Sequence, residues 1–484
     1  MLFASFVVGL AGLAPSALAA PVDLNATVVN IDLPPYFRTM GGFTPWAPNT
    51  QGYGIEDKLP VECTVDQATL LSRHGMRYAS AGTGRGTQAV VDRIRNATFD
   101  VRDPALAFLK THRYDLPVEQ LTDWGRRDLV LAGQTFTERY ATLIAGNQKS
   151  VPLRTTTQSR MFDSATSFAQ GFTQAQPGTH LEWTVVPDAS PAFNTTLAVG
   201  TCKADKLGIY APVTNMLPSQ WVAVYVPPIT ARLNAALFGL NLTDNEVMSL
   251  QSGCPFETVA NNAVSPLCGI FTPSEWADYS YYQDLQQFTS AGYGGPLGRA
   301  WGVGWVNELL ARLTDSPVVD HTSTNTTMDA DPATFPLGRS VYLDFAHDTQ
   351  LNSAIAVLGL LRDKEGVITG SARNEDRKWQ IPNIAEMGGR LWVERVECKS
   401  QPTVRNKCSP EAKLNGTFVR LVLNHAVLPL DIAPCTTNAA RAKHAGLCRL
   451  NDFVESQSFA RAGGSWVNCD YTTLDEWKAA GSPT

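Results

Sequence analysis

The chain has 484 residues, 44% of them hydrophobic, which is enough to bury a large core; length alone predicts about three domains. Its 39 basic and 45 acidic residues give a net charge of −6 without a block of like charge, which excludes an extended nucleic-acid-binding surface. Any site for an anionic ligand must therefore be local.

The N-terminal stretch MLFASFVVGLAGLAPSALAA is apolar and ends in small residues, with the A-x-A pattern at Ala17 to Ala19. This is typical of a cleaved secretory signal, although the usual Lys or Arg is missing, and a membrane anchor is the alternative. Pro15 and the small residues favour cleavage, and no other stretch approaches the roughly 18 apolar residues that span a bilayer. We therefore expect residues 1–20 to be a signal peptide, and the mature chain to be secreted and free of the membrane.

Two further features agree with secretion. The nine cysteines include no CxxC pair, which favours disulfides over a zinc site, and their odd number leaves one thiol over. Sequons of the form N-x-S/T predict glycosylation wherever they lie at the surface. They occur at Asn25, Asn96, Asn194, Asn241, Asn325 and Asn415.

In chain order, residues 21–62 are rich in Pro and Gly and predict an irregular arm over the core. CTVDQATLLSRHG, residues 63–75, predicts a buried strand that runs into a loop. Residues 121–144 and 302–315 carry apolar residues at helical spacing, the first behind a TDW cap. The middle of the chain is therefore expected to be largely helical.

RSVYLDFAHD, residues 339–348, repeats the strand-to-loop form of residues 63–75, again with a histidine in the loop. Residues 388–398 and 416–430 alternate like paired antiparallel strands, with NHA as a tight turn. Strand-loop elements thus flank a helical middle, and no internal repeat occurs. The sequence predicts an α/β sheet whose ligand lies at the carboxyl ends of the strands.

The stretch LLSRHGMRY places Arg73 and Arg77 around His74. Guanidinium groups match phosphate oxygens two at a time and stabilise the charge of a transferring phosphoryl group. Nearby cations also lower the pKa of an imidazole, which keeps it neutral and nucleophilic in mildly acidic medium. These residues predict a phosphate site with His74 as the nucleophile.

A phosphohistidine intermediate requires a proton for the departing alkoxide, and Asp348 is the candidate general acid. Its neighbour His347 is expected to face the same phosphate. RTTTQSRMFDSA, residues 154–165, adds Arg154 and Arg160 near the start of a helix whose dipole would also favour an anion. Only one of these two arginines need be catalytic.

Each motif alone has an ordinary structural explanation, since an RHG tripeptide is often an ion-paired loop and an HD pair is common. The combination in two strand-loop contexts favours phosphoryl chemistry. GTGRGT lacks the ending of a phosphate loop, and neither GxSxG nor HExxH occurs. His425 in the predicted turn and the pair Trp301 and Trp305 are expected to be structural. The other histidines without a motif, expected at the surface or in the core, are His112, His180, His321 and His444.

These motifs resemble those of the histidine acid phosphatase family, and longer segments resemble its secreted fungal branch, the phytases. The likeness rests on LLSRHGMRY and DFAHDT and continues through FLKTHRYDL, the segment from GPLGRAW to LDFAHD, and SFARAGGSWVNC. It runs from about Cys63 to Cys469 and so covers most of the mature chain.

The resemblance implies a phosphomonoesterase that acts on a small phosphate ester, phytate above all, and that needs no metal or organic cofactor. It implies His74 as nucleophile and Asp348 as proton donor. The implied ligands of the reacting phosphate are Arg73, Arg77, Arg160 and His347, with Arg154 as a weaker substrate-binding candidate.

The implied fold is phosphoglycerate-mutase-like. It has a large α/β domain with a mixed sheet from residues 21–150 and 330–484, and a smaller, mainly helical domain from residues 151–329. The site is expected in the cleft between them. The implied disulfides are Cys63–Cys398, Cys202–Cys469, Cys254–Cys268 and Cys435–Cys448, which leaves Cys408 over.

Two departures from the family pattern leave the phosphate ligands intact. Ala79 stands where the family motif has Pro, which loosens the loop, and Thr349 stands where fungal phytases commonly have Asn.

A third departure concerns the rim of the site. Gln286 and Gln287 stand where many phytases carry lysines that face the polyanionic substrate, and Arg85 and Lys110 are the candidates to compensate. A less basic rim suits singly phosphorylated esters, so a broad-specificity acid phosphatase is the alternative to a phytase.

Two hypotheses come from other classes: a secreted glycoprotein that binds phosphorylated ligands without turnover, and a mutase of the same superfamily. The presence of both His74 and Asp348 speaks against the first, and secretion together with the HD pair speaks against the second. Because Asp348 must be protonated and His74 neutral, we expect the rate to peak between about pH 4 and 6, from ordinary pKa values of about 4 and 6.5.

Overall fold

The computed structural model describes residues 32–146, 150–188, 193–399 and 414–482. The expected signal peptide, the sequon at Asn25 and the odd cysteine Cys408 lie outside these residues. Among the described residues, no helix combines the length and the apolar character that crossing a bilayer requires.

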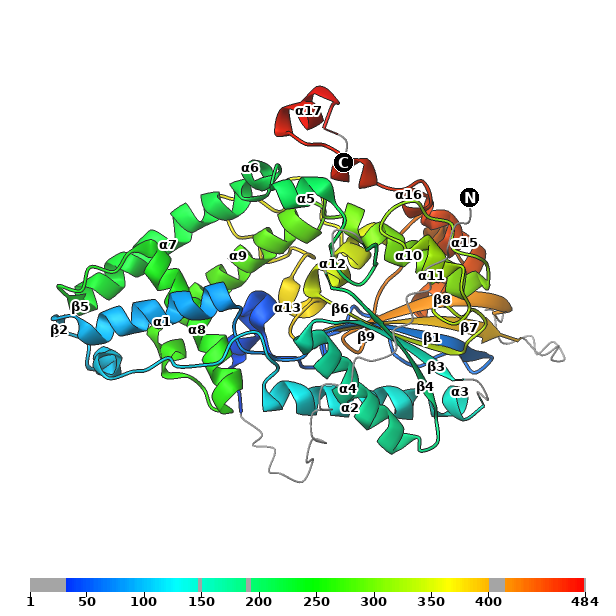
Figure 1. Ribbon diagram of the computed structural model, residues 1–484, viewed down its shortest axis with the longest axis horizontal. Coiled ribbons are helices and arrows are strands. Elements are labelled where there is room, and N and C mark those ends of the chain that lie inside the picture. Colours follow the sequence, from blue (N-terminus) through cyan, green and yellow to red (C-terminus); the bar gives the residue numbers. More distant parts are fainter. Residues whose placement is uncertain (1–31, 147–149, 189–192, 400–413, 483–484) are drawn as a thin grey trace, which may run out of the picture.

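A mixed sheet forms the centre of the larger part of the molecule (Figure 1). Strand β1 (Cys63–Arg73) lies between β6 (Val341–Ala346), parallel to it, and β7 (Arg390–Cys398), antiparallel to it. The sheet order is β10 (Cys448–Arg449), β8 (Gly416–Leu423), β7, β1, β6, β3 (Val151–Thr156) and β4 (Leu181–Val186), with β9 (Ala426–Val427) paired to β8. The strands β6, β3 and β4 are mutually parallel, whereas β7 and β8 are antiparallel. The expected mixed α/β sheet is confirmed.

The strand sequences explain their places in the sheet. Every residue of β1 from Gln67 to Arg73 is buried, because the strand has neighbours on both sides and helices on both faces. The predicted NHA turn joins β8 to β9, and its residues Asn424 and His425 have φ angles of 48° and 70°. A two-residue turn with both central residues at positive φ matches the twist of antiparallel strands, so the predicted hairpin is confirmed.

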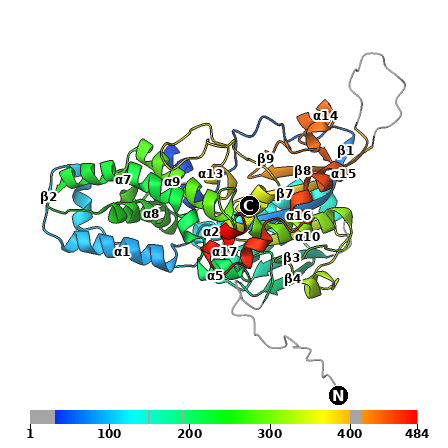
Figure 2. The same ribbon diagram turned by 90° about the horizontal axis from the view of Figure 1, so that it is seen from above.

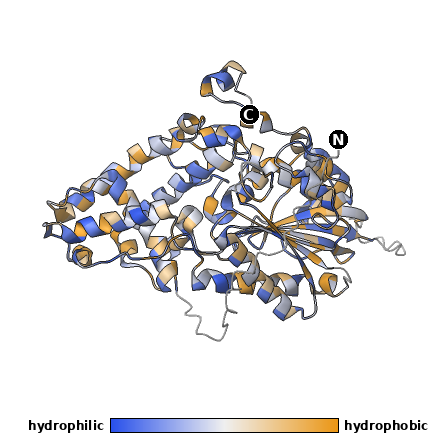
Figure 3. Cartoon of the chain, in the orientation of Figure 1, coloured by the Kyte–Doolittle hydropathy of each residue, from blue (hydrophilic) through white to orange (hydrophobic). Residues whose placement is uncertain are grey.

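Helices cover both faces of the sheet. On one face lie α2 (Asp123–Arg139) and α4 (Ser159–Ala175), and on the other lie α10 (Val303–Thr314) and α12 (Asp348–Val357) (Figure 1). Figure 3 shows hydrophobic residues along the strands and along the helices that pack on them. The helices predicted from residues 121–144 and 302–315 are α2 with α3 (Ala141–Ala145), and α10.

The TDW cap is also confirmed, because the Thr122 side chain accepts a hydrogen bond from the Gly125 N–H at the start of α2. Trp305 is buried in the core beneath the sheet, as expected for a structural residue.

A second group of helices lies beside the sheet at the other end of the long axis, as Figures 1 and 2 both show. It contains α1 (Ala81–Asn96), α7 (Met216–Ala236), α8 (Asp244–Asn261) and α9 (Pro273–Ala291). These helices enclose a hydrophobic core of their own. Capping boxes at Thr243 and Thr272 fix the starts of α8 and α9.

The predicted domain boundary at residue 151 needs correction. Strands β3 and β4, within residues 151–186, pair with β6 in the large sheet, and α4 is the crossover between them. Parallel strands require such a crossover, so the helix at 159–175 belongs to the α/β part. Conversely, α1 precedes residue 151 but packs with the helical group. The helical pattern of the middle of the chain does not reveal these two six-residue strands.

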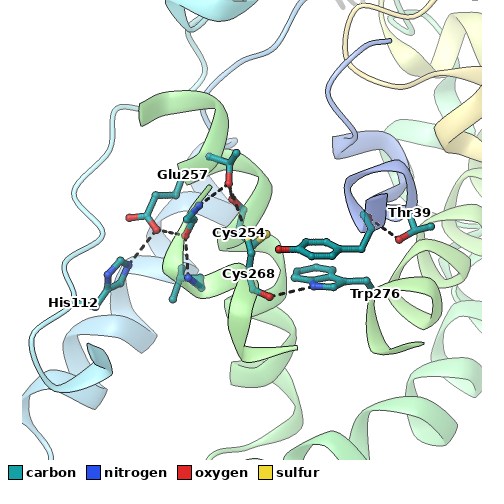
Figure 4. The surroundings of a disulfide bond; sticks show 10 residues. Thr39, His112, Cys254, Glu257, Cys268 and Trp276 are labelled. Atoms are coloured by element: carbon teal, nitrogen blue, oxygen red, sulfur yellow. Dashed lines mark hydrogen bonds and ion pairs between the residues drawn. A yellow bond between two sulfur atoms is a disulfide. The ribbon is translucent and has the colours of Figure 1, made fainter. Parts of the chain in front are cut away.

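Among the described residues, four disulfides are formed: Cys63–Cys398, Cys202–Cys469, Cys254–Cys268 and Cys435–Cys448. They are the pairs that the resemblance implies. Figure 4 shows Cys254–Cys268, which joins α8 to the following 3₁₀ helix (Pro266–Ile270). Beside it, His112 Nε2 lies 3.2 Å from Glu257, which also accepts from Ser265. His112 is thus a structural residue, as expected.

The remaining elements are short. The strands β2 (Asp100–Val101) and β5 (Leu237–Phe238) pair with each other. The other helices are α5 (Lys203–Leu207), α6 (Ala211–Thr214), α11 (Thr326–Asp329), α13 (Ile381–Ile384), α14 (Ala440–His444), α15 (Leu450–Ser456), α16 (Ser458–Arg461) and α17 (Leu474–Ala479).

Candidate active site

The two histidine loops meet at one edge of the sheet. Arg73 ends β1, Ala346 ends β6, and the two residues are register partners in this parallel pair. The loops that follow, with His74 in one and His347 in the other, therefore leave the sheet side by side, and their imidazole rings lie 6.1 Å apart. The predicted meeting of the two loops is confirmed.

The loop after β1 is held tightly by its neighbours. The Gly75 N–H donates to Ser164 Oγ (3.1 Å), and the His74 carbonyl accepts from the Gly388 N–H (2.8 Å). Helix α2 begins so close to this loop that a Cβ on Gly125 would lie 2.0 Å from the Met76 carbonyl oxygen. Only glycine fits at this close approach, which keeps the loop in one conformation.

His74 is buried, and its Nδ1 lies 2.9 Å from the Gly75 carbonyl oxygen. Because a carbonyl only accepts hydrogen bonds, Nδ1 carries the proton and Nε2 of the neutral ring carries the lone pair. Burial lowers the pKa of His74 well below its usual value, and the charges of Arg73, Arg77, Arg160 and His347 lower it further. The ring is therefore neutral in acidic medium, with a nucleophilic nitrogen.

Three arginines surround His74. Nη1 of Arg73 donates to the carbonyls of Gly42 and Ala385 (both 2.6 Å), which fixes the guanidinium group. Arg77 Nη1 donates to the Tyr78 carbonyl, and Arg160 Nη1 pairs with Glu119 at 2.5 Å.

Each guanidinium group has nitrogen atoms without a hydrogen-bond partner among the described residues. These atoms are Nε of all three arginines and also Nη2 of Arg73. Burial lowers the pKa of Arg77 to about 10, and the charges of Arg73 and Arg160 add to this effect. Buried donors without acceptors, on cations that repel one another, define a site for an anion.

Asp348, the first residue of α12, lies at the edge of the same cluster. Its Oδ2 is 3.0 Å from Arg73 Nη2, an ion pair without hydrogen-bond alignment. Burial raises the pKa of this carboxyl, but the charges of Arg73, His347 and Arg77 outweigh burial and leave the pKa below its ordinary value. Asp348 is therefore ionised in the free site.

The structure corrects the prediction for Arg154. This arginine is buried under the sheet, where it bonds to Asp344 (2.8 and 2.9 Å) and Glu308 (2.5 Å). Its charge is satisfied by these two carboxylates, so it is a core residue and not a substrate contact. Successive side chains of a strand alternate between the two faces of the sheet, and Arg154 points to the face that packs against α10, which carries Glu308.

The rim candidates lie on the helical group. Arg85 is exposed on α1, and Lys110 lies over the ring of Phe99 at 5.0 Å. Gln286 donates to the Tyr282 hydroxyl (2.8 Å), whereas Gln287 accepts from Asn352 on α12 (3.0 Å). Gln287 thus ties α9 to the helix that begins with Asp348.

Sequence reasoning missed two acidic residues at the site, Asp188 and Glu119. Asp188 lies 2.9 Å from His347 Nε2 and follows the end of β4 by two residues, so the strand-to-loop signal used for the histidine loops was present there too. Glu119 accepts hydrogen bonds from Arg160 and from the Ala81 N–H. It lies at a positive φ of 68°, and no sequence pattern around it indicates either this conformation or a role at the site.

The described residues contain no group of three or more His, Cys, Asp or Glu side chains placed to hold a metal ion. What they contain is a neutral imidazole with a free Nε2, three arginines with free donors, and a carboxyl that can exchange a proton. This arrangement can bind a phosphate group and transfer it to His74.

The fold and the site are those of a phosphatase with a histidine nucleophile, and the comparisons agree. The chain belongs to the histidine phosphatase superfamily (branch 2), whose family model matches residues 64–424. It is 34% identical to Phytase A of Aspergillus fumigatus over 450 residues, which cover 89% of this chain and 90% of that protein. It is also 34% identical to Phytase A of Neurospora crassa over 467 residues, which cover 86% and 89%.

Solved structures share the fold. The crystal structure of the phytase from D. castellii has a TM-score of 0.72 at 24% identity and covers 93% of this chain and 91% of its own. The multiple inositol polyphosphate phosphatase of Bifidobacterium longum, in complex with inositol hexasulfate, has a TM-score of 0.57 at 12% identity and covers 87% and 97%.

Proposed function

We propose that this protein is a secreted acid phosphomonoesterase that hydrolyses phytate through a phosphohistidine on His74. The observation that carries the proposal is the free Nε2 of a neutral, buried His74 among three arginines with unpartnered donors. Arg73, Arg77, Arg160 and His347 bind the reacting phosphate, and Asp348 is the proton donor.

In the first step, His74 Nε2 attacks phosphorus and the ester P–O bond breaks, while Asp348 gives its proton to the leaving oxygen. In the second step, water attacks the phosphohistidine, its proton passes to Asp348, and the electron pair of the P–N bond returns to Nε2. Inorganic phosphate leaves and both groups are restored.

The proton on Asp348 has to come from outside the free site, because the pKa of this carboxyl is lowered there. Below about pH 6 a phosphate monoester carries one acidic proton. When such a monoanion binds to Arg73, it weakens the ion pair between Arg73 and Asp348. The acidic proton of the bound ester can then pass to Asp348. Activity is therefore expected at acidic pH, with a decline as the substrate loses its second proton.

Phytate is the favoured substrate because the relatives from Aspergillus fumigatus and Neurospora crassa, which resemble this chain over most of their length, are both named Phytase A. The neutral side chains of Gln286 and Gln287 favour the alternative, a broad-specificity acid phosphatase, because a polyanion gains more than a monoester from a basic rim. Secretion rests on the signal-like N-terminus, and the exposed sequons at Asn96, Asn241 and Asn415 are the favoured glycosylation sites.

Phosphate release at pH 5 from phytate and from p-nitrophenyl phosphate, measured side by side, tests the proposal. A higher kcat/KM on phytate, lost in His74→Ala, supports a phytase. A preference for p-nitrophenyl phosphate establishes the broad-specificity alternative. Release from neither substrate by the folded wild-type protein contradicts both.

The role of Asp348 has its own test. p-Nitrophenolate leaves without a proton, whereas an inositol alkoxide does not. Asp348→Asn should therefore lower kcat on phytate by about 10²–10⁴-fold and kcat on p-nitrophenyl phosphate much less. Equal losses on the two substrates would contradict the assignment as general acid.

A further inference from the structure

His347 lies between the ring of His74 and the carboxylate of Asp188, and the contact with Asp188 has a consequence for phosphate binding. We propose that Asp188 is a positioning residue whose carboxylate keeps His347 as an imidazolium, turned so that its other ring nitrogen can donate to the bound phosphate. The inference rests on the proposed function only in taking phosphate as the ligand of this site.

The contact between these two side chains is direct and well supported. His347 Nε2 lies 2.9 Å from Asp188 Oδ1, and both side chains are largely buried, with exposed fractions of 13% and 17%. The backbone of Asp188 is fixed as well, because its N–H donates to Thr157 Oγ1 (3.2 Å) beyond the end of β3. The carboxylate therefore holds the ring from the β3–β4 edge of the sheet.

The protons of His347 can be assigned from this contact. A carboxylate only accepts hydrogen bonds, so Nε2 of His347 carries a proton. In a neutral ring Nδ1 would then carry a lone pair, which repels phosphate oxygens. In the imidazolium both nitrogens donate, so one N–H serves Asp188 and the other is free for the substrate.

The surrounding charges show why a carboxylate is needed there. His347 interacts with the ring of His74 and with Asp348, and Arg160 faces Asp188, whereas Arg73 and Arg77 face His74 and Asp348. A further cation beside three arginines is unfavourable unless an anion stands next to it.

Asp188 itself stays ionised in acidic medium. Burial raises the pKa of this carboxyl, but the hydrogen bond and charge of His347, with smaller effects from Thr156 and Arg160, outweigh burial and leave the pKa below its ordinary value. Its negative charge is thus present wherever the enzyme is expected to work.

Binding of inorganic phosphate, measured by calorimetry between pH 4 and 7, tests the inference without requiring turnover. Asp188→Asn keeps a hydrogen-bond acceptor but removes the negative charge beside the imidazolium ring of His347. We expect nearly unchanged affinity at pH 4 and about tenfold weaker affinity than wild type at pH 6.5.

Three variants complete the test. Asp188→Glu, which keeps the charge, should retain binding at pH 6.5, whereas Asp188→Ala should bind more weakly at every pH. Asp278→Asn is the matched control, since Asp278 is a similarly shielded aspartate paired with Arg373 on the helical group, and it should behave as wild type. Melting temperatures report whether each variant is folded.

Equal weakening by Asp188→Asn at every pH would reduce Asp188 to a packing residue and overturn the inference, as would unchanged binding. If Asp188→Asn does not fold, loss of binding at pH 6.5 by Asp188→Glu overturns it instead. A wild-type protein that binds phosphate as described but releases none from esters would contradict the proposed function and leave this inference standing.

Discussion

Two groups of buried arginines lie at different places on the sheet, one packed against α10 and one at the end of β1, and they differ in what faces them. Under the sheet, Asp344 accepts from Arg154 and Arg312, and Glu308 accepts from Arg154, so two cations meet two anions. Burial raises the pKa of Asp344, but these arginines outweigh burial and keep it lowered.

At the end of β1, by contrast, the charge of Arg160 helps to lower the pKa of Arg73 and Arg77, and each of the three arginines keeps a donor without a partner among the described residues. The difference separates two roles of one residue type. Fully paired arginines hold the fold together, whereas the donors left over in the second set suit the phosphate of the proposed function.

The largest effect is expected at the site. Arg160→Ala removes one donor to the phosphate and should lower kcat/KM by about 10²–10³-fold, with little loss of stability because it also relieves repulsion. Steady-state kinetics and thermal melting check this. Arg232→Ala, in a comparable ion pair with Glu275 on the helical group, is the control. A variant with wild-type kcat/KM would place Arg160 outside the phosphate site.

The core arginine should behave in the opposite way. Arg154→Ala leaves Asp344 and Glu308 underpaired and should lower the free energy of unfolding by about 3–5 kcal/mol, because a buried charge loses its partner. The kcat of the folded fraction should stay close to wild type. Urea denaturation and kinetics on the same preparation separate the two quantities. A large loss of kcat without loss of stability would return Arg154 to the site.

Glu386 sharpens the comparison because it is as buried as Asp344 but, in the part of the chain that the structure describes, forms no ion pair, and the more distant arginines only partly offset its burial. Its Oε2 accepts from Asn424 Nδ2 (2.8 Å), and burial raises the pKa of Glu386 to about 8. Between pH 4.5, the ordinary pKa of a glutamate, and pH 8, the carboxyl of Glu386 is ionised in the unfolded chain but keeps its proton in the folded protein.

The contribution of Glu386 to stability is thus complete below pH 4.5 and falls by about 1.4 kcal/mol per pH unit up to pH 8. Glu386→Gln should flatten the decline in the free energy of unfolding between pH 5 and 8. Denaturant titrations at several pH values measure it. An unchanged slope would show that Glu386 ionises on its own within the fold.

The smallest effect is expected at the rim. Gln286→Lys should raise kcat/KM on phytate by about three- to tenfold at low salt and leave p-nitrophenyl phosphate almost unaffected, because added positive charge attracts a polyanion more strongly. The gain should shrink as salt is added. Gln174→Lys, the same charge change on the exposed side of α4, is the control. Equal gains from both lysines would point to net charge and not to the rim.

Strand-to-loop patterns were sufficient to predict the sheet and the meeting of His74 with His347, because these depend on local periodicity and on the parallel pairing of β1 and β6. They were insufficient for Arg154 and Arg160, which lie six residues apart in one segment. Which of them reaches the phosphate depends on the face of β3 and on Asp344 and Glu308, which lie far away in sequence. The domain boundary was misplaced for a similar reason, since strand pairing is a long-range property.

Chemical trapping of the phosphoenzyme tests the central claim most directly. Protein mixed with a labelled phosphate ester at pH 5 is quenched within milliseconds, and the modified residue is mapped by mass spectrometry. The account predicts an acid-labile, base-stable phosphoryl group on Nε2 of His74, which is absent in His74→Ala. Turnover without a covalent intermediate, or a phosphoryl group on another residue, would contradict it.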